Sequence, residues 1–352
     1  MEQPGIVAVG QALPKHFASQ EELIAAFRGL WSRRHFNLER LEQLHRAVQV
    51  GGRHLALPVE AYERLSSFAE ANRAFCECAV ELGAQAIERA LHAAKLASRD
   101  VDRIVFTTVT GIATPSIDAR LVNRLGLRGD VKREPLFGLG CVAGAAGIAR
   151  ASDALRGFPD EVAVLLSVEL CSLTLQRDDL SIPNVIASGL FGDGAAAVVL
   201  AGGRRPLAGP RVVASRSVFY PHTEGVMGWD VVEGGFRVVL SAAVPQLVRE
   251  HARGDVDSFL ADHGLRRADV RHWICHPGGP KVIDALEEAL ELPGGALART
   301  RRSLREVGNL SSASVLFVLG DTLREARPQP GDHGLLLAMG PGFCSELVLL
   351  RW

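Results

Sequence analysis

Short apolar runs recur along the chain and alternate with segments of helical periodicity. Residues 103–108 and 161–167 are nearly uncharged runs that predict buried strands, and residues 191–200 contain a tight Gly-Asp-Gly turn that leads into another strand. Between these runs, residues 116–125 and 141–155 carry apolar side chains at helical spacing. This alternation predicts an α/β protein whose strands are largely buried.

The pattern restarts after residues 202–210, a Gly- and Pro-rich segment that is the best candidate for a linker. Beyond it the sequence predicts strands at 211–218, 272–276, 334–339 and 346–350, and helices at 241–260, from Pro280 and near Asn309. We therefore expect two α/β halves of similar plan, residues 1–203 and 204–352.

Residues 15–100 have a different pattern, which predicts mostly helical structure. Ser19 and Glu22 have the spacing of a capping box ahead of an apolar helix. Residues 62–94 hold Ala, Leu and Ile at helical spacing. A helical segment is therefore expected inside the first half, ahead of its strands.

Composition excludes several classes of protein. The chain has 352 residues, 47% of them hydrophobic, which is enough apolar material to exclude wholesale disorder. A formal net charge of −1 gives no nucleic-acid signature. No apolar stretch is long enough to span a membrane, and the first residues do not resemble a signal peptide, so a cytoplasmic protein is expected. The six cysteines include no C-x-x-C pair, which argues against a metal site and favours reduced thiols.

Cys141 is the first candidate for chemistry. It precedes a segment made almost entirely of Gly and Ala, which predicts a helix thin enough to be buried between two sheets. A Cys in the first turn of such a helix faces the positive end of the helix dipole, which favours the thiolate. The alternative is an inert buried Cys.

His276 and Asn309 are the other candidates. His276 ends an apolar strand and precedes a Gly-rich turn, a place where α/β proteins often put reactive groups, although such a His can also serve only the turn. Asn309 can be a helix N-cap or an amide donor to an oxyanion. A nucleophilic Cys, a His base and an amide donor together would make a plausible thioester site.

Five segments, in order, resemble type III polyketide synthases, the chalcone and stilbene synthase family of the thiolase superfamily. They are Gly-Cys-Val-Ala-Gly at 140–144, Gly-Leu-Phe-Gly-Asp-Gly-Ala-Ala-Ala at 189–197, His-Pro-Gly-Gly-Pro at 276–280, Gly-Asn-Leu-Ser-Ser-Ala at 308–313 and Met-Gly-Pro-Gly at 339–342. The resemblance implies a five-layered, duplicated αβαβα fold, a homodimer, and no cofactor beyond the coenzyme A carried by the substrates.

The resemblance also implies an acyltransferase mechanism with Cys141, His276 and Asn309 as its triad. Cys141, as a thiolate paired with the imidazolium of His276, attacks the starter acyl-CoA. His276 and Asn309 then hold the thioester oxygen of malonyl-CoA while carbon dioxide leaves. The resulting carbanion attacks the acyl-enzyme, the cycle repeats, and the chain cyclises.

Several further positions match residues of the family's substrate cavity. Phe191 matches a gatekeeping aromatic, while Val238 stands where plant members have a second ring, and nearby Phe236 could substitute for it. The other matches are Cys171 and Thr174, which would line the cavity; Thr114, which would reach the partner subunit's cavity; and Glu169 and Ser311, which belong to a hydrogen-bond network in plant members. Val109 replaces a Thr of that network, which argues against their aldol-type route.

Coenzyme A needs basic residues for its phosphates at the mouth of the tunnel. An N-terminal cluster supplies candidates, and Lys281 sits near the pantetheine path by the same match. The members of the cluster are Arg33, Arg34, Arg40, Arg46 and Arg53. A solvated helix face is the alternative interpretation of this cluster.

The small and aliphatic cavity positions predict a medium- or long-chain fatty acyl-CoA starter, extended by malonyl-CoA to an alkyl α-pyrone and in part to an alkylresorcinol. An alternative is the synthesis of tetrahydroxynaphthalene from malonyl-CoA alone, since such bacterial enzymes share the Glu-Leu/Phe-Cys-Ser pattern seen at 169–172. A ketoacyl synthase III-type initiation enzyme and a non-catalytic acyl-binding scaffold are further alternatives.

Overall fold

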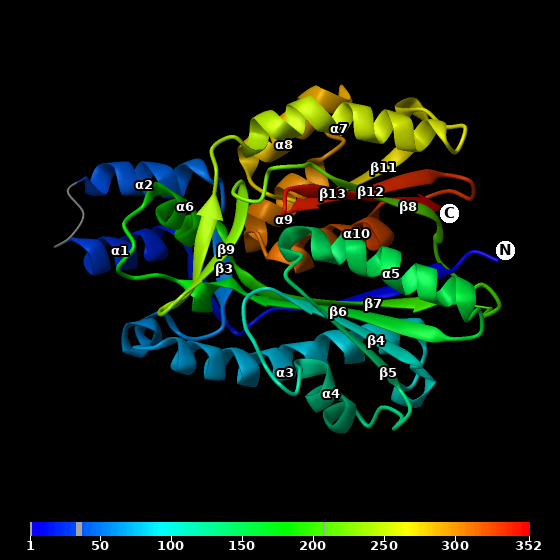
Figure 1. The fold of residues 1–352 in the computed structure, drawn as a ribbon, viewed down its shortest axis with the longest axis horizontal. Coiled ribbons are helices and arrows are strands. Elements are labelled where there is room, and N and C mark those ends of the chain that lie inside the picture. The colour runs from blue at the N-terminus through cyan, green and yellow to red at the C-terminus, as the bar shows by residue number, and fades with distance from the viewer. Residues whose placement is uncertain (1, 33–36, 207) are drawn as a thin grey trace.

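The chain folds into five stacked layers in the order α, β, α, β, α (Figure 1). The structure is a computed structural model that describes residues 2–32, 37–206 and 208–352. One outer layer holds α3 (Phe68–Ala94) and α4 (Ile117–Leu125), and the other holds α7 (Val244–Ala261) and α8 (Pro280–Leu290). Helices α5 (Ala143–Gly157) and α10 (Ser314–Glu325) lie between the two β layers. The predicted αβαβα architecture is confirmed.

Each half of the chain supplies one β layer. In the first layer the strand order is β1 (Gly5–Ala12), β7 (Asp193–Ala201), β6 (Val162–Leu170), β4 (Arg103–Thr108) and β5 (Lys132–Phe137). In the second it is β11 (Val270–Cys275), β12 (His333–Gly340), β13 (Cys344–Arg351) and β8 (Arg211–Phe219). A backbone pairing between Gly5 and Arg211 joins the two layers into one nine-stranded sheet of described residues.

Burial on both faces explains why the strand sequences are apolar. Every residue of β6 and of β7 is buried, because α3 packs on one face of these strands and the central helices α5 and α10 pack on the other. The central helix α5 is thin enough to fit between the layers. A Cβ at its Gly144 would lie 2.3 Å from the carbonyl oxygen of Ser312, so only Gly permits this approach.

The first hundred residues are less helical than predicted. They contain α1 (Gln20–Trp31) and α2 (Leu38–Ala47), but also the hairpin of β2 (His16–Ser19) and β3 (Gly52–Leu55). The capping box at Ser19 and Glu22 is present at the start of α1. The long helix begins at Phe68 rather than near residue 62, because Ser67 caps it with its side chain.

Four further features were not predicted. They are β1, α6 (Ile182–Leu190), α9 (Ala298–Val307), and the hairpin of β9 (Met227–Val232) and β10 (Gly235–Leu240). This hairpin forms a small sheet of its own, and most of its residues are only half buried. Its sequence therefore lacks the continuous apolar run that marks the central strands.

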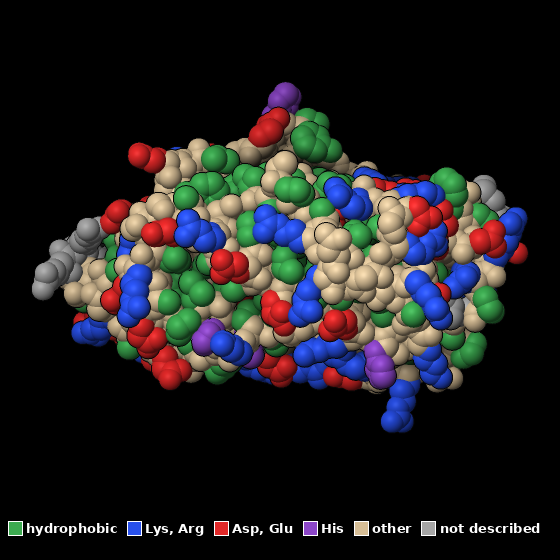
Figure 2. Space-filling model, turned by 90° about the horizontal axis from the view of Figure 1, so that it is seen from below, with side chains coloured by type: hydrophobic (Ala, Val, Ile, Leu, Met, Phe, Trp, Pro, Cys, Tyr) green, Lys and Arg blue, Asp and Glu red, His purple; other side chains and the backbone are tan. Residues whose placement is uncertain are grey.

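The surface carries both signs of charge. Figure 2 shows basic and acidic side chains interspersed over the face on which α3 and α4 lie. Among the described residues, no helix has the length and apolar character needed to cross a membrane.

Candidate active site

The two halves of the chain meet around a cavity of about 500 Å³, which we call the outer cavity. Cys141 reaches it from the first half, and His276 and Asn309 reach it from the second. Ser311, Phe191, Val238 and Lys281, all singled out in the sequence, line it as well. Three turns that are distant in sequence thus converge on one space.

Cys141 lies in a turn of 3₁₀-helix, Gly140–Val142, that runs directly into α5. Its side chain is buried, and its Sγ lies 3.7 Å from the hydroxyl oxygen of Ser311. Gly140 has a φ of +55°, and a Cβ at this position would lie 2.7 Å from the ring of Pro341, so the turn that presents the thiol needs Gly here. The sulfur therefore stands at the N-terminal end of the central helix, where the helix dipole favours negative charge.

His276 follows β11 and continues its pairing, since its backbone N–H donates to the carbonyl of Leu337 at 2.9 Å. The side chain is buried, and neither ring nitrogen has a hydrogen-bond partner among the described residues. Two unpaired polar atoms in a buried site are unfavourable unless a ligand satisfies them. The imidazole is thus free to bond a substrate oxygen or the Cys141 thiol.

Asn309 is held rigidly by its own loop. Its Oδ1 accepts a hydrogen bond from the backbone N–H of Ser311 at 2.8 Å, and its Nδ2 donates to the carbonyl of Gly278 at 3.3 Å. Its backbone bridges both sides of Phe191, through Leu190 and Gly192. An amide carries two N–H donors, so one remains to face the outer cavity. Asn309 is not the N-cap, since Leu310 holds that position before the 3₁₀ turn Ser311–Ala313, and its role as an oxyanion donor remains a prediction.

Burial shifts the pKa values of Cys141 and His276 in opposite directions. It raises the pKa of the Cys141 thiol to about 12 and lowers the pKa of His276 to about 3, because either charge alone is poorly solvated. Transfer of the thiol proton to the imidazole creates both charges at once, and each then stabilises the other. The thiolate–imidazolium pair inferred from the resemblance remains a prediction, and it depends on His276 being present.

We expect His276→Gln to slow alkylation of Cys141 by iodoacetamide at neutral pH by about tenfold or more. Without the imidazole no cation compensates the thiolate, and burial alone then keeps the thiol pKa high. The rate of the variant should rise only in alkaline solution, whereas the wild-type rate should be nearly level across neutral pH. Mass spectrometry of the peptide that contains Cys141 measures both rates.

Ser311→Ala serves as the control, since it removes the other polar neighbour of the sulfur without removing a base. Equal alkylation rates for wild type and His276→Gln at pH 7 would show that His276 does not activate the thiol.

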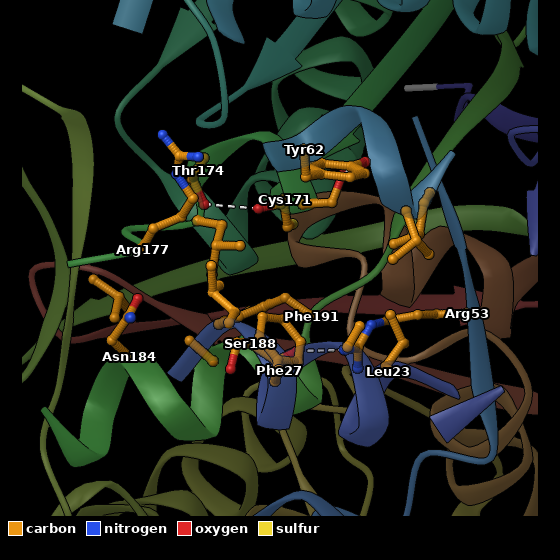
Figure 3. A pocket seen from close by; sticks show the side chains of 18 of the residues that line it. Leu23, Phe27, Arg53, Tyr62, Cys171, Thr174, Arg177, Asn184, Ser188 and Phe191 are labelled. Atoms are coloured by element: carbon orange, nitrogen blue, oxygen red, sulfur yellow. Dashed lines mark hydrogen bonds between the residues drawn. The ribbon is translucent and has the colours of Figure 1, made fainter. Parts of the chain in front are cut away.

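A second space, which we call the inner cavity, adjoins the outer one and has a volume of about 100 Å³. Figure 3 shows the side chains that line it. Phe191, Trp229 and Val238 line both cavities and so form the partition between them. The rings of Phe191 and Trp229 pack with their centroids 6.2 Å apart. The positions of Phe191 and Val238 fit the gate that the resemblance implied.

Trp229 was not identified from the sequence, although it shares the partition with both gate residues. Its element, β9, has no strong sequence signal, and an isolated Trp in a weak strand is not distinctive. Phe236, considered as a substitute for Val238, is buried against the rings of Phe68 and Phe137 instead. Val238 is therefore the β10 residue that faces the partition.

The remaining cavity matches have different placements. Cys171 and Thr174 line the inner cavity, as the resemblance implied (Figure 3). Thr114 is exposed in the loop between β4 and α4, on the surface of the single chain. A role for Thr114 in a partner's cavity remains a prediction.

Arg53 is not at the surface, contrary to its assignment as a coenzyme A contact. It is 2% exposed and lines the inner cavity. Its guanidinium donates to the carbonyls of Ser188 and Gly189, just before Phe191, and to Gln20. Because these acceptors hold the group inside the fold, we remove Arg53 from the candidate contacts of coenzyme A.

The other basic candidates lie nearer to solvent. Lys281 is exposed at the start of α8 and lines the outer cavity. Arg40 and Arg46 are exposed on α2, the helix whose Ala47 lines the same cavity, but Arg46 is paired with Glu21 and Glu42. Arg33 and Arg34 lie outside the described residues.

Glu169 is fully buried, and a hydroxyl network surrounds it. Its carboxylate accepts hydrogen bonds from the hydroxyls of Thr110 and Ser312 and from the backbone N–H of Val109. The hydroxyl contact to Glu169 that a Thr at position 109 would provide is thus supplied here by Thr110 and Ser312. Ser311 instead contacts Cys141.

Comparison with known proteins matches nearly the whole chain. The model of the N-terminal domain of chalcone and stilbene synthases matches residues 2–204, and that of their C-terminal domain matches residues 211–352. A 1,3,6,8-tetrahydroxynaphthalene synthase of Streptomyces peucetius subsp. caesius is 53% identical over 350 residues, covering 99% of this chain and 93% of the relative. A putative chalcone synthase of Bacillus subtilis is 35% identical over 358 residues, covering 99% and 98%.

A solved structure agrees with these matches. The crystal structure of 1,3,6,8-tetrahydroxynaphthalene synthase from Streptomyces coelicolor A3(2), a bacterial type III polyketide synthase, superimposes with a TM-score of 0.94 at 32% identity. The superposition covers 99% of each chain. The similarity thus extends over both halves and the cavities between them.

Proposed function

This chain belongs to the chalcone and stilbene synthase family, the type III polyketide synthases, and from this premise we propose that it uses malonyl-CoA as both starter and extender to make a fused polyhydroxylated aromatic of the tetrahydroxynaphthalene type. Members of the family are acyltransferases that act on coenzyme A thioesters and need no further cofactor. The observation that carries the proposal is the 53% identity to a tetrahydroxynaphthalene synthase over almost the full chain.

The proposed reaction uses the triad in two ways. The Cys141 sulfur attacks the starter thioester while its proton passes to His276, and coenzyme A leaves as the thiol. The thioester oxygen of the next malonyl-CoA then accepts hydrogen bonds from His276 and Asn309, which stabilise the enolate left when carbon dioxide departs. The enolate carbon attacks the Cys141 thioester, and the Cys141 thiolate is the leaving group.

The wall of the inner cavity offers a polyketide both apolar contact and polar partners. Most of this wall is apolar, and the polar side chains in it are Arg53, Tyr62, Ser172, Thr174, Asn184 and Ser188, together with Glu63 and Arg177. A growing polyketide has an oxygen on every second carbon and can bond such groups. Because these groups already hydrogen-bond within the protein, for example Thr174 to the carbonyl of Cys171 and Asn184 to that of Gln176, the wall is compatible with either starter, and the choice of malonyl-CoA rests on the relative of 53% identity.

Incubation with labelled malonyl-CoA, with and without a panel of fatty acyl-CoAs, tests the starter. We expect the same aromatic product at the same rate in both cases, with no incorporation of the acyl chain. A product that requires an added acyl-CoA, and contains it, would contradict the proposal and restore the alkyl α-pyrone hypothesis.

Trp229→Ala should widen the use of starters. Removing the indole widens the passage between the two cavities. Each methylene group of a starter that gains a contact there contributes about 1–3 kcal/mol to the discrimination between starters. We expect kcat/KM for a medium-chain acyl-CoA to rise by about tenfold relative to malonyl-CoA. Trp229→Phe, which keeps a ring in the partition, should change this ratio much less. An unchanged ratio in Trp229→Ala would show that the partition does not select the starter.

We also propose that the two halves, residues 1–203 and 204–352, fold as one unit and that the enzyme is a cytoplasmic homodimer. Strand β1 pairs with β7 of its own half and meets β8 of the other at Gly5 and Arg211, so separation would break a continuous sheet. Lys281 and Arg40 are the candidates for coenzyme A phosphates. Light scattering of the purified chain tests the dimer, and a single cooperative unfolding transition tests the unit.

A further inference from the structure

A chain of hydrogen bonds runs from the wall of the inner cavity into the core. The Tyr62 hydroxyl lies 2.5 Å from the hydroxyl of Ser172, and Ser172 in turn donates to the carboxylate of Asp193. Tyr62 and Ser172 both line the inner cavity, and Figure 3 shows the Tyr62 ring on its wall. Asp193 is fully buried at the start of β7. None of these groups belongs to the Cys–His–Asn site.

The donors and acceptors fix the direction of this chain. The Asp193 carboxylate also accepts from the backbone N–H groups of Ser172 and Ala56. Since the single hydroxyl proton of Ser172 points to Asp193, the Tyr62 hydroxyl must donate to the oxygen of Ser172. A proton that reaches the Tyr62 oxygen can therefore be passed, by two shifts along existing hydrogen bonds, to Asp193.

The surroundings of Asp193 favour the uptake of a proton by its carboxylate. Burial raises the pKa of Asp193 to about 6, although its hydrogen bonds with Ser172 and Ala56 and the charge of Arg53 act in the opposite sense. Burial also raises the pKa of Tyr62, so the phenol stays protonated. Arg53 of β3 interacts electrostatically with Asp193, Tyr62 and Cys171. Burial raises the pKa of the Cys78 thiol on α3, and the negative charge of Asp193 raises it further. Arg53 is the cation of this group and would stabilise negative charge on a ligand in the cavity.

We propose that Tyr62, Ser172 and Asp193 form a second catalytic group, a proton relay for ring closure of the polyketide in the inner cavity. The inference rests on the proposed function, since it concerns what happens to the chain after extension. The triad at Cys141 would build the chain, and the relay would direct its cyclisation by carbon–carbon bond formation.

The relay balances its protons over one ring closure. A methylene between two carbonyls loses a proton to the Tyr62 oxygen, the Tyr62 proton moves to Ser172, and the Ser172 proton moves to Asp193. The enolate carbon then attacks a ketone carbonyl of the same chain, so a C–C bond forms and the C=O π bond becomes an alkoxide. The protons return in reverse order, and the alkoxide takes one from Tyr62.

Tyr62→Phe and Ser172→Ala test the relay with malonyl-CoA as substrate. Loading of Cys141 and decarboxylation should continue, but the chain should close through oxygen to a lactone, a closure that needs no carbon acid. We expect the ratio of carbocyclic aromatic to lactone products to fall by about tenfold or more, the range of general acid–base effects. Carbon dioxide release should change less than twofold, and chromatography measures the ratio.

Tyr220→Phe is the matched control, because Tyr220 is the other Tyr of the chain and its hydroxyl also donates to a carboxylate, that of Asp255, away from both cavities. It should leave the product ratio unchanged.

A pH profile separates a relay from a structural role. In the wild type, the aromatic share of the products should fall as the pH drops through about 6, because Asp193 becomes protonated there and can accept no further proton. This decrease near pH 6 should be absent in Tyr62→Phe.

The outcomes discriminate between the hypotheses. Folded Tyr62→Phe and Ser172→Ala proteins with the wild-type product ratio would overturn the relay, as would a reduced ratio in Tyr62→Phe that keeps the step near pH 6. Absence of any product from malonyl-CoA in the wild type would instead contradict the proposed function. In that case the same ratio measured with an acyl-CoA starter still tests the relay.

Discussion

Cys141→Ala is expected to abolish polyketide formation while the protein stays folded. The thiol is the nucleophile that would carry the growing chain, and Ala offers no atom to form the thioester. Loss of a covalent nucleophile commonly costs about 10³-fold or more in turnover. The structural cost is small, since removing one buried atom of this size destabilises by about 1 kcal/mol.

Product formation from labelled malonyl-CoA measures the loss, and the thermal unfolding temperature checks the fold. The variant should still release carbon dioxide from malonyl-CoA, because His276 and Asn309 remain in the outer cavity. Cys76→Ala, on α3 and away from both cavities, is the matched control and should keep full activity. Product formation by Cys141→Ala near the wild-type rate would disprove the assignment of the nucleophile.

The parts of the fold that were predictable are those in which local sequence and burial agree. The strand at Arg103–Thr108 has the apolar run Ile-Val-Phe at its centre, and all of its residues are buried, while the Gly- and Ala-rich composition of α5 follows from its place between two β layers. Cys141, His276 and Asn309 could be proposed as a set only because each stands in a short motif whose order resembles one family. Their convergence on one cavity is a property of the sheet order.

The features that escaped prediction depend on contacts between distant segments. Tyr62 and Ser172 are 110 positions apart, and although Ser172 belongs to the Glu-Leu-Cys-Ser pattern at 169–172, nothing in the sequence places it beside Tyr62. Arg53 looked like its exposed neighbours because a sequence shows its charge but not the carbonyls of Ser188 and Gly189 that surround it. Trp229 lies on a hairpin outside the main sheet, so its contact with Phe191 arises only in the folded chain.

Asn309→Ala is expected to lower the rate of malonyl-CoA decarboxylation by about 10²- to 10³-fold, the usual effect of removing one oxyanion donor. The effect concerns the step in which negative charge moves onto the thioester oxygen. Alkylation of Cys141 should keep its wild-type rate, since the amide does not contact the sulfur in the described hydrogen bonds. Carbon dioxide release and alkylation, measured on the same preparation, separate the two functions.

Asn309→Asp distinguishes catalysis by the amide from support of the loop. The Ala variant also loses Oδ1, which accepts from the backbone N–H of Ser311, and this contact contributes about 1 kcal/mol to stability. Asp keeps that acceptor but replaces the N–H donor with a carboxylate oxygen, which repels the developing enolate. If Asn309 acts as a donor, Asp should restore stability and decarboxylate no faster than Ala. If decarboxylation recovers with Asp, the residue serves the loop, and the oxyanion must be held by His276 without it.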